Sequence, residues 1–140
     1  MNQFVEQPRE ALRPLVDTPE ALDNCMDSLS RGIGPVAFDA ERAHGHRYWP
    51  KAYLFQIRRE GAGTWLIDPI AFEHGGETEL GGLVGACSDA PWIIHAASQD
   101  LPCMLDVGIH PPTLFDTELA GREDVRIDRL TFRMNDVQFN

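Results

Sequence analysis

The sequence lacks the features that define several common protein classes. It has only three cysteines, Cys25, Cys87 and Cys103, and no C-x-x-C spacing. An odd, scattered set excludes a disulfide framework and a cysteine-based zinc site, and it is typical of reduced thiols in a reducing compartment. No apolar run approaches the ~20 residues of a membrane span, and the first residues lack the cationic and apolar regions of a signal peptide. We therefore expect no membrane contact and a cytoplasmic location.

Positive charge is also scarce. Lysine and arginine together number 12 against 22 aspartates and glutamates, which gives a net charge of −10. This balance excludes a nucleic-acid binder of the usual basic, patch-driven kind. It is compatible with a metal site, because carboxylate ligands raise the negative count and bound cations offset part of it. The length of 140 residues suits one domain with a real core.

Hydrophobic periodicity and turn residues predict a mixed α/β order. A Thr-Pro-Glu start at residue 18 opens a helix that glycines end at 32–34, and an apolar strand follows at 36–41. Residues 52–58 and 64–68 form a hairpin across a short glycine turn. A marginal helix at 79–87, a buried strand at 91–95, a helix at 98–106 and a brief strand at 113–115 complete the order. A hairpin followed by strand–helix–strand predicts a mixed sheet flanked by helices.

Two carboxylates end the first strand. Because side chains alternate along a strand, Asp39 and Glu41 share one face while Phe38 and Ala40 share the other. Two acids on one face of an apolar strand are costly unless a positive group neutralises them, and a divalent cation does so most directly. The alternative is a solvated strand end. The residues alone leave both interpretations open.

Further acids fall near the carboxyl ends of strands, where ligands collect in parallel α/β sheets. Asp100 lies in the first turn of the helix at 98–106, where simple complementarity to the helix end also explains it. Asp116 is interpreted as a helix N-cap, with Glu118 in the same turn. His95 ends a buried strand and is interpreted as a hydrogen-bonded structural histidine in preference to a metal ligand or base.

The loop after the first strand is rich in cations and aromatics. Tyr48 and Tyr53, together with Arg42, could stack bases and hold phosphates, or the aromatics could simply pack on the sheet edge. His44 and His46 have no third ligand at useful spacing, so loop solvation or phosphate contact is preferred to a metal pair. No nucleophile–base pair is visible.

An ordered set of short motifs carries a family resemblance: 38–41 (FDAE), 52–57 (AYLFQI), 66–69 (LIDP), 95–101 (HAASQDL) and 115–120 (FDTELA). In this order and spacing they resemble ribonuclease D and its relatives in the DEDD superfamily of 3′–5′ exonucleases. The resemblance runs from about residue 14 to residue 122. It implies a ribonuclease-H-like mixed sheet, in agreement with the order of elements above.

The resemblance also implies an active site. The first motif of the family supplies an Asp and a Glu, which match Asp39 and Glu41, and the second supplies an Asp, which matches Asp100. In the family these residues ligate two Mg²⁺ or Mn²⁺ ions, and the enzyme releases nucleoside monophosphates from the 3′ end of RNA or single-stranded nucleic acid. The candidates for substrate contact are Arg42, Tyr48, Tyr53, His95 and Gln99.

The sequence departs from the family in its last part. The third motif of the family, a Tyr with an Asp four residues later, has no counterpart, because the only tyrosines are Tyr48 and Tyr53. We accordingly expect an extended lead-in at 1–17, a partial exonuclease domain at 18–122 and an atypical tail at 123–140. Loss of a ligand and of the group that positions the water should weaken catalysis. The alternative is a non-catalytic remnant of the fold that binds nucleic acid or protein.

Overall fold

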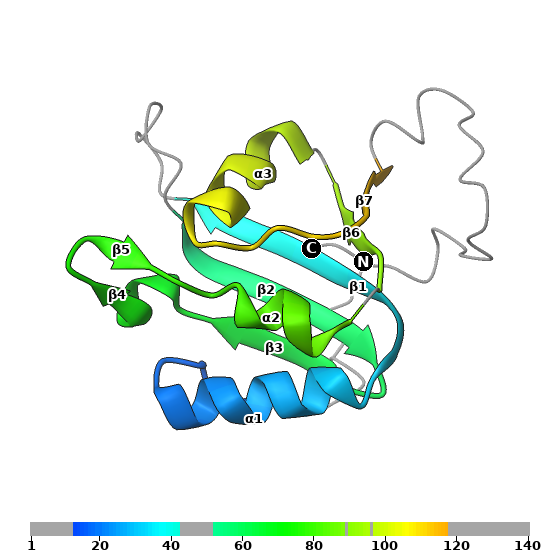
Figure 1. Cartoon of the computed structure of the whole chain (residues 1–140), viewed down its shortest axis with the longest axis horizontal. Coiled ribbons are helices and arrows are strands. Elements are labelled where there is room, and N and C mark those ends of the chain that lie inside the picture. Colours follow the sequence, from blue (N-terminus) through cyan, green and yellow to red (C-terminus); the bar gives the residue numbers. More distant parts are fainter. Residues whose placement is uncertain (1–12, 43–51, 89, 96, 118–140) are drawn as a thin grey trace, which may run out of the picture.

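The computed structural model describes residues 13–42, 52–88, 90–95 and 97–117, built around a five-stranded mixed sheet (Figure 1). The strands are β1 (Ile33–Arg42), β2 (Ala52–Glu60), β3 (Gly63–Ile67), β6 (Trp92–Ile94) and β7 (Leu114–Asp116). Their order across the sheet is β3-β2-β1-β6-β7. β1 is antiparallel to β2, and β2 to β3, whereas β6 and β7 run parallel to β1. The predicted mixed sheet is confirmed.

The β2–β3 hairpin forms where the sequence predicts it. Gly61 and Gly63, which flank the tight turn, both have positive φ angles, of 85° and 80°. Side-chain-bearing residues rarely adopt this conformation, so glycine is required at both positions. The indole nitrogen of Trp65 donates to the Ala62 carbonyl at 2.9 Å and closes the turn from the buried side.

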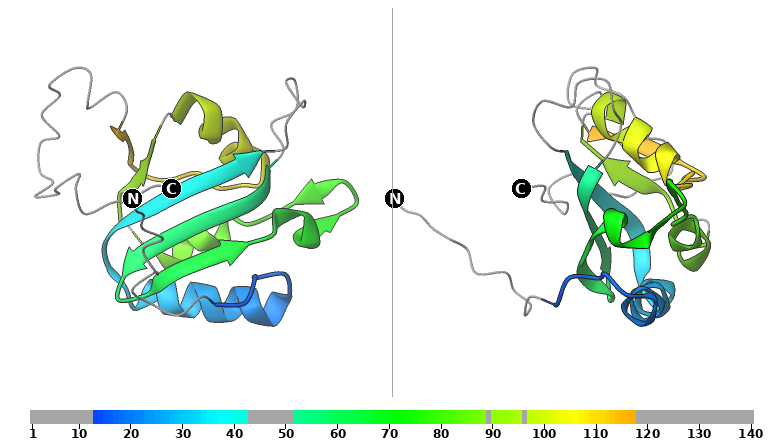
Figure 2. Two further views of the ribbon diagram at one scale, coloured as in Figure 1. Left: turned by 180° about the vertical axis from the view of Figure 1, so that it is seen from behind. Right: turned by 90° about the vertical axis from the view of Figure 1, so that its left-hand side faces the viewer.

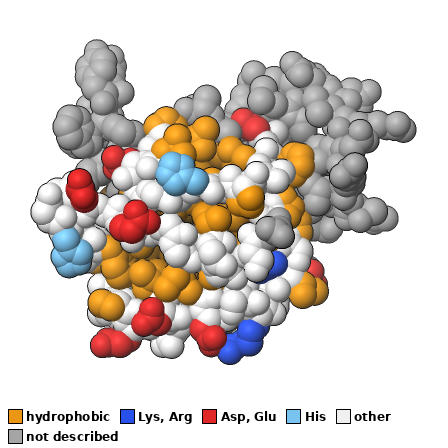
Figure 3. Space-filling model, in the orientation of Figure 1, with side chains coloured by type: hydrophobic (Ala, Val, Ile, Leu, Met, Phe, Trp, Pro, Cys, Tyr) orange, Lys and Arg blue, Asp and Glu red, His pale blue; other side chains and the backbone are white. Residues whose placement is uncertain are grey.

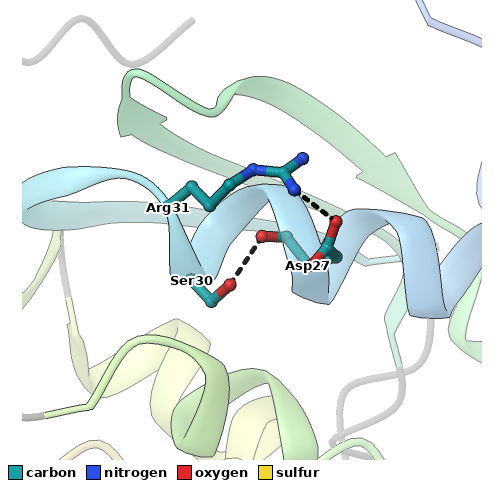
Figure 4. A network of polar contacts seen from close by, with 3 residues as sticks. All are labelled: Asp27, Ser30 and Arg31. Carbon is teal, nitrogen blue, oxygen red and sulfur yellow. Dashed lines mark hydrogen bonds and ion pairs between the residues drawn. The ribbon is translucent and has the colours of Figure 1, made fainter.

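Helix α1 (Pro19–Ser30) begins at the predicted cap, where the Thr18 hydroxyl accepts a hydrogen bond from the Ala21 amide at 3.1 Å. Figure 4 shows its other end, where Arg31 pairs with Asp27 at 2.7 Å and the Ser30 hydroxyl donates to the Asp27 carbonyl at 2.6 Å. Both partners of the ion pair are more than half exposed, so the pair contributes little to stability.

Three further segments connect β3 to β6, and the first two were not predicted. Asp68 caps a 3₁₀ helix, η1 (Pro69–Phe72), by accepting from the Ile70 amide at 2.9 Å. A small hairpin of β4 (Glu73–His74) and β5 (Glu77–Thr78) turns at 75–76, where both glycines have positive φ. The short helix α2 (Gly82–Ala86) lies within the predicted marginal helix. Helix α3 (Ala97–Asp106) then links β6 to β7.

The core lies between one face of the sheet and the helices. The right-hand view of Figure 2 shows α1, α2 and α3 on the same side of the sheet. Phe38 is central, with ring centroids 5.1 Å from Phe55 and 5.6 Å from Trp92. The helices contribute Leu29 from α1 and Met104 from α3, both fully buried. Val36, Phe38 and Ala40 therefore mark the covered face of β1, which leaves the intervening side chains on the opposite face.

The segment just before α1 contacts the edge of the sheet. Val16 forms a parallel bridge with Ile67 at the β3 edge, and its backbone pairs with Leu66 and Asp68 at 2.8 and 3.0 Å. The domain limits predicted at 17 and 122 stay predictions, and the tail lies outside the described residues. Among the described residues, no helix combines the length and the apolar character that crossing a membrane needs.

Candidate active site

The carboxyl-terminal half of β1 presents two acids away from the core. Asp39 is half-buried and Glu41 is exposed. Phe38, which precedes Asp39, and Ala40, which lies between the two acids, are both buried. This alternation is the one predicted from the sequence. In the β1–β2 register Asp39 lies opposite Gln56 and Glu41 opposite Leu54. The two carboxylates therefore share the sheet face that the helices leave uncovered.

Asp100 can contact β1 because the neighbouring strand β6 is short and ends before it reaches Ala40. The Val36 amide points toward β6 and donates to the Pro91 carbonyl at 2.9 Å, and by strand alternation the Ala40 amide points the same way. The paired register of β6 covers only Val36 and Ala37. Beyond that point β1 has no strand partner on this side, and the Ala40 amide donates instead to the Asp100 carboxylate at 3.4 Å. The first turn of α3 thus delivers an acid to the edge of β1.

Asp39 and Asp100 form an electrostatically strained pair. Asp100 is only 5% exposed, and it is the one buried charged residue among the described part of the chain. Burial, first of all, together with the negative charge of Asp39 and a hydrogen bond with that carboxyl, raises the pKa of the Asp100 carboxyl to about 6. The Ala40 amide and the nearby Arg42 guanidinium act in the opposite direction. Two adjacent carboxylates favour a shared proton or a shared cation.

The pair fits a divalent metal ion by its donors. Carboxylate oxygens are the ligands that Mg²⁺ prefers, and a bound cation would offset both the burial of the Asp100 charge and its repulsion by Asp39, the two main causes of the raised pKa of Asp100. Within the described ranges no three His, Cys, Asp or Glu side chains are close enough to one another to hold a metal ion. The structure therefore brings together Asp39 and Asp100, and the role of Glu41 as a further ligand stays a prediction.

Two predicted substrate contacts lie at the carboxyl-terminal end of β1, the same end as this pair. Arg42 ends β1 and is close enough to Asp100 to lower the pKa of that carboxyl. Tyr53 is the extra residue of an irregularity in the β1–β2 ladder, where Glu41 lies opposite Leu54 but Arg42 lies opposite Ala52. Such bulges redirect side chains, and the Tyr53 ring is 47% exposed. Tyr48 and the side chain of Gln99 lie outside the described residues.

The sequence analysis missed a cation on the same face. Arg58 lies opposite Ala37, two positions along β2 from the partner of Asp39, so it is a diagonal cross-strand neighbour of that acid, within reach of a long side chain. Its guanidinium donates to the Thr64 hydroxyl at 2.9 Å, and Arg13 donates to the Thr64 carbonyl at 3.1 Å. The i, i+2 spacing from Gln56 could have identified Arg58 once the hairpin register was known.

The face of the molecule that the helices cover is mainly acidic, unlike the sheet face that carries Arg58 (Figure 3). Figure 3 shows acidic side chains distributed over this face and lysine or arginine side chains at few places on it. A nucleic-acid backbone is repelled by such a surface. Asp39, Glu41 and Arg58 lie on the opposite face of β1 and β2, so that face is the better candidate for a strand of nucleic acid.

A hollow of about 320 Å³ lies at the other end of β1 and is unrelated to the acids. It is lined by Gly34, Pro35, Arg59, Cys87, Ser88, Ala90 and Pro91. Arg59 is engaged there with the carbonyls of Gly34 and Leu29 at 3.0 and 2.8 Å. These bonds join α1, β1 and β2, so we assign Arg59 a structural role.

His95 and Asp116 lie at the carboxyl ends of the neighbouring parallel strands. Asp116 is the last residue of β7, opposite Ile94 in β6, and Thr117 after it is helical; the role of Asp116 as a cap stays a prediction. The Nδ1 atom of His95 lies 3.0 Å from the Thr117 hydroxyl. His95 is hydrogen-bonded, as the sequence suggested, but its side chain is exposed.

Comparison with known proteins decides the family. Residues 14–129 match the sequence profile of the family described as 3′–5′ exonuclease. The chain belongs to this exonuclease family. A search of curated proteins gave no match. Among solved structures, a protein from Bifidobacterium adolescentis has a TM-score of 0.75 and 39% identity over 84% of this chain and 28% of its own.

Two further exonuclease structures share the fold. Escherichia coli RNase D, an exoribonuclease involved in structured RNA processing, has a TM-score of 0.63 and 24% identity over 79% of this chain and 28% of its own. The EXD2 exonuclease domain soaked in Mn and GMP has a TM-score of 0.60 and 15% identity over 84% of this chain and 63% of its own. The chain thus spans little more than a quarter of the length of the first two proteins. The ribonuclease-H-like, DEDD-type fold predicted from the motifs is confirmed.

Proposed function

We propose that this exonuclease domain removes nucleotides from the 3′ end of RNA, or of single-stranded nucleic acid, by metal-dependent hydrolysis. The observation that carries the proposal is the convergence of Asp39 and Asp100 from two separate elements, with the pKa of Asp100 raised to about 6. A protein maintains such a repulsive pair at a cost in stability, and a divalent cation relieves that cost. The Mn-soaked EXD2 domain supports the same choice of metal.

Asp39, Glu41 and Asp100 would hold two Mg²⁺ or Mn²⁺ ions at the end of β1. When bound, these ions supply an activated water and neutralise charge on the leaving 3′ oxygen. The Ala40 amide fixes the Asp100 carboxylate so that its oxygens keep one orientation toward Asp39. Glu41 is exposed two residues further along the same strand face, where it could complete the ligand set from the solvent side.

The substrate would lie on the sheet face opposite the helices. Arg42 and Arg58 flank the acids on adjacent strands and would contact the phosphates next to the terminal one. Tyr53, exposed at the bulge, would stack on a base. These two arginines would neutralise phosphate charges of the nucleic acid at the site, although the protein as a whole carries a net charge of −10 and repels the nucleic acid.

A hydrolysis assay tests the proposal. The purified chain is incubated with a 3′-labelled single-stranded RNA and Mg²⁺ or Mn²⁺, and release of labelled mononucleotide is measured. We expect release in the wild type, loss of release with EDTA, and loss in Asp39→Ala. Asp23→Asn serves as the matched control, because Asp23 is an exposed acid on α1 and its substitution should leave the rate unchanged.

The alternative, a non-catalytic remnant of the fold, makes a different prediction. No release at high protein concentration, combined with retained RNA binding that requires Arg58, would contradict hydrolysis and establish a binding role. A binding assay by fluorescence anisotropy with Arg58→Ala supplies that measurement.

A further inference from the structure

Gln56 faces Asp39 directly across the β1–β2 ladder. The two residues are paired in the register, so their Cβ atoms lie about 4.5–5.5 Å apart on the sheet face that the helices leave uncovered. On the other side of β1 lies Asp100, which accepts a hydrogen bond from the Ala40 amide. Asp39 therefore has an acid on one side and an uncharged amide on the other.

The Gln56 amide is available to a ligand. The side chain is only half-buried, and none of the residues that the structure describes forms a hydrogen bond with it. Its nitrogen and oxygen are also not among the described side-chain atoms that are both unpaired and sealed from solvent. An amide offers two N–H donors and one acceptor. These groups are therefore open on the face that carries Asp39 and Arg58.

The chemistry of the amide suits a phosphate held beside the acids. An arginine opposite Asp39 would pair with that carboxylate and compete with a cation for it, and a glutamate would repel a phosphate. A glutamine donates hydrogen bonds to phosphate oxygens without either effect. Arg58, which carries a full positive charge, lies two residues further along β2 and is only a diagonal neighbour of Asp39.

We propose that Gln56 donates a hydrogen bond to a non-bridging oxygen of the scissile phosphate. This inference rests on the proposed function and deepens it, because it gives the reacting phosphate a donor from β2 that the acids do not supply. Arg58, on the same strand face, then contacts the next phosphate. Because a fixed donor acts most strongly where charge develops in the transition state, the contact should affect kcat more than KM.

The contact is tested first by binding, without turnover. The scissile phosphate stays on the released nucleotide as its 5′-phosphate, so uridine 5′-monophosphate presents this group and uridine does not. The side-chain amide signal of Gln56 in a ¹H–¹⁵N spectrum is the one that is absent from Gln56→Met. With Mg²⁺ present, we expect uridine 5′-monophosphate to shift this signal and uridine at the same concentration to leave it in place.

Kinetics on the 3′-labelled RNA supply a second measurement. Gln56→Met retains the length and neutrality of the side chain and has no N–H donor. We expect it to lower kcat by about 100-fold and to change KM by less than about twofold, whereas Arg58→Ala should raise KM. Gln56→Glu should lose at least as much in kcat, because a negative charge then faces the phosphate. Gln56→Met should unfold at the same urea concentration as the wild type, since no described residue pairs with the amide.

The contrary outcomes have different meanings. A Gln56 signal that stays in place while other amide signals respond to uridine 5′-monophosphate would overturn the contact and leave the proposed function intact. Wild-type kcat in Gln56→Met, or a rise in KM alone, would overturn it in the same way. A wild type that neither binds uridine 5′-monophosphate nor hydrolyses RNA would contradict the proposed function, and the contact would be lost with it.

Discussion

Replacing Asp100 by asparagine should stabilise the metal-free protein at alkaline pH. Burial and the charge of Asp39 raise the pKa of the Asp100 carboxyl from its ordinary 3.8 to about 6. The folded state therefore binds the proton more tightly than the unfolded state, and stability falls as pH rises from about 4 to about 6. A shift of roughly two units corresponds to about 3 kcal/mol. Asparagine removes the charge and retains an oxygen that can accept from the Ala40 amide.

The assay is urea unfolding, in EDTA, of the wild type and Asp100→Asn at several pH values from 4 to 8. The difference in unfolding free energy should approach zero near pH 4 and reach up to about 3 kcal/mol in favour of Asp100→Asn at pH 8. Adding Mn²⁺ at pH 8 should stabilise the wild type more than the variant, because only the wild type has the full carboxylate pair. A difference that is the same at every pH would show that Asp100 is not a buried, repelled carboxylate, and the site as described would be wrong.

Three further predictions concern the fold and the thiols. Phe38→Ala should cost about 3–5 kcal/mol in urea unfolding, because it removes the ring between Phe55 and Trp92, whereas Ile33→Ala, at a 63% exposed position on the same strand, should change stability by less than about 0.5 kcal/mol; equal effects would contradict the assigned core face. Thr18→Ala should cost about 1 kcal/mol by loss of the α1 cap, and no change would show that the cap is not formed. All three thiols are free and buried, and burial raises the pKa of Cys25 to about 12. A thiol-specific reagent at pH 8 should therefore label the unfolded chain and not the native one. Fast labelling of the native protein would contradict the burial of the thiols.

Local patterns predicted the central elements of the fold. The Thr-Pro-Glu start placed α1 within one residue, and the glycines at 61 and 63 placed the β2–β3 turn. Both signals are local, because a cap and a positive φ depend on the residues themselves. The β4–β5 hairpin and η1 were missed because two-residue strands are too short to show any periodicity.

The candidate site was predictable in part. Strand alternation placed Asp39 and Glu41 on one face, and the structure agrees with it. That Asp100 meets β1 depends on how early β6 ends, which is a tertiary feature that only the family resemblance anticipated. The position of Arg58 required the hairpin register, and the hydrogen bond between His95 and Thr117 joins residues 22 positions apart. Such contacts follow from the packing of strands and not from any local pattern.

The most direct test of the central claim is a calorimetric titration of the metal-free chain with Mn²⁺ at pH 7.5. We predict heat of binding in the wild type and in Asp23→Asn, and its loss in Asp39→Asn and in Asp100→Asn. A weaker or incomplete titration in Glu41→Gln would add Glu41 to the ligand set. Titrations of the two pair variants that match the wild type would contradict the claim that Asp39 and Asp100 form a metal site.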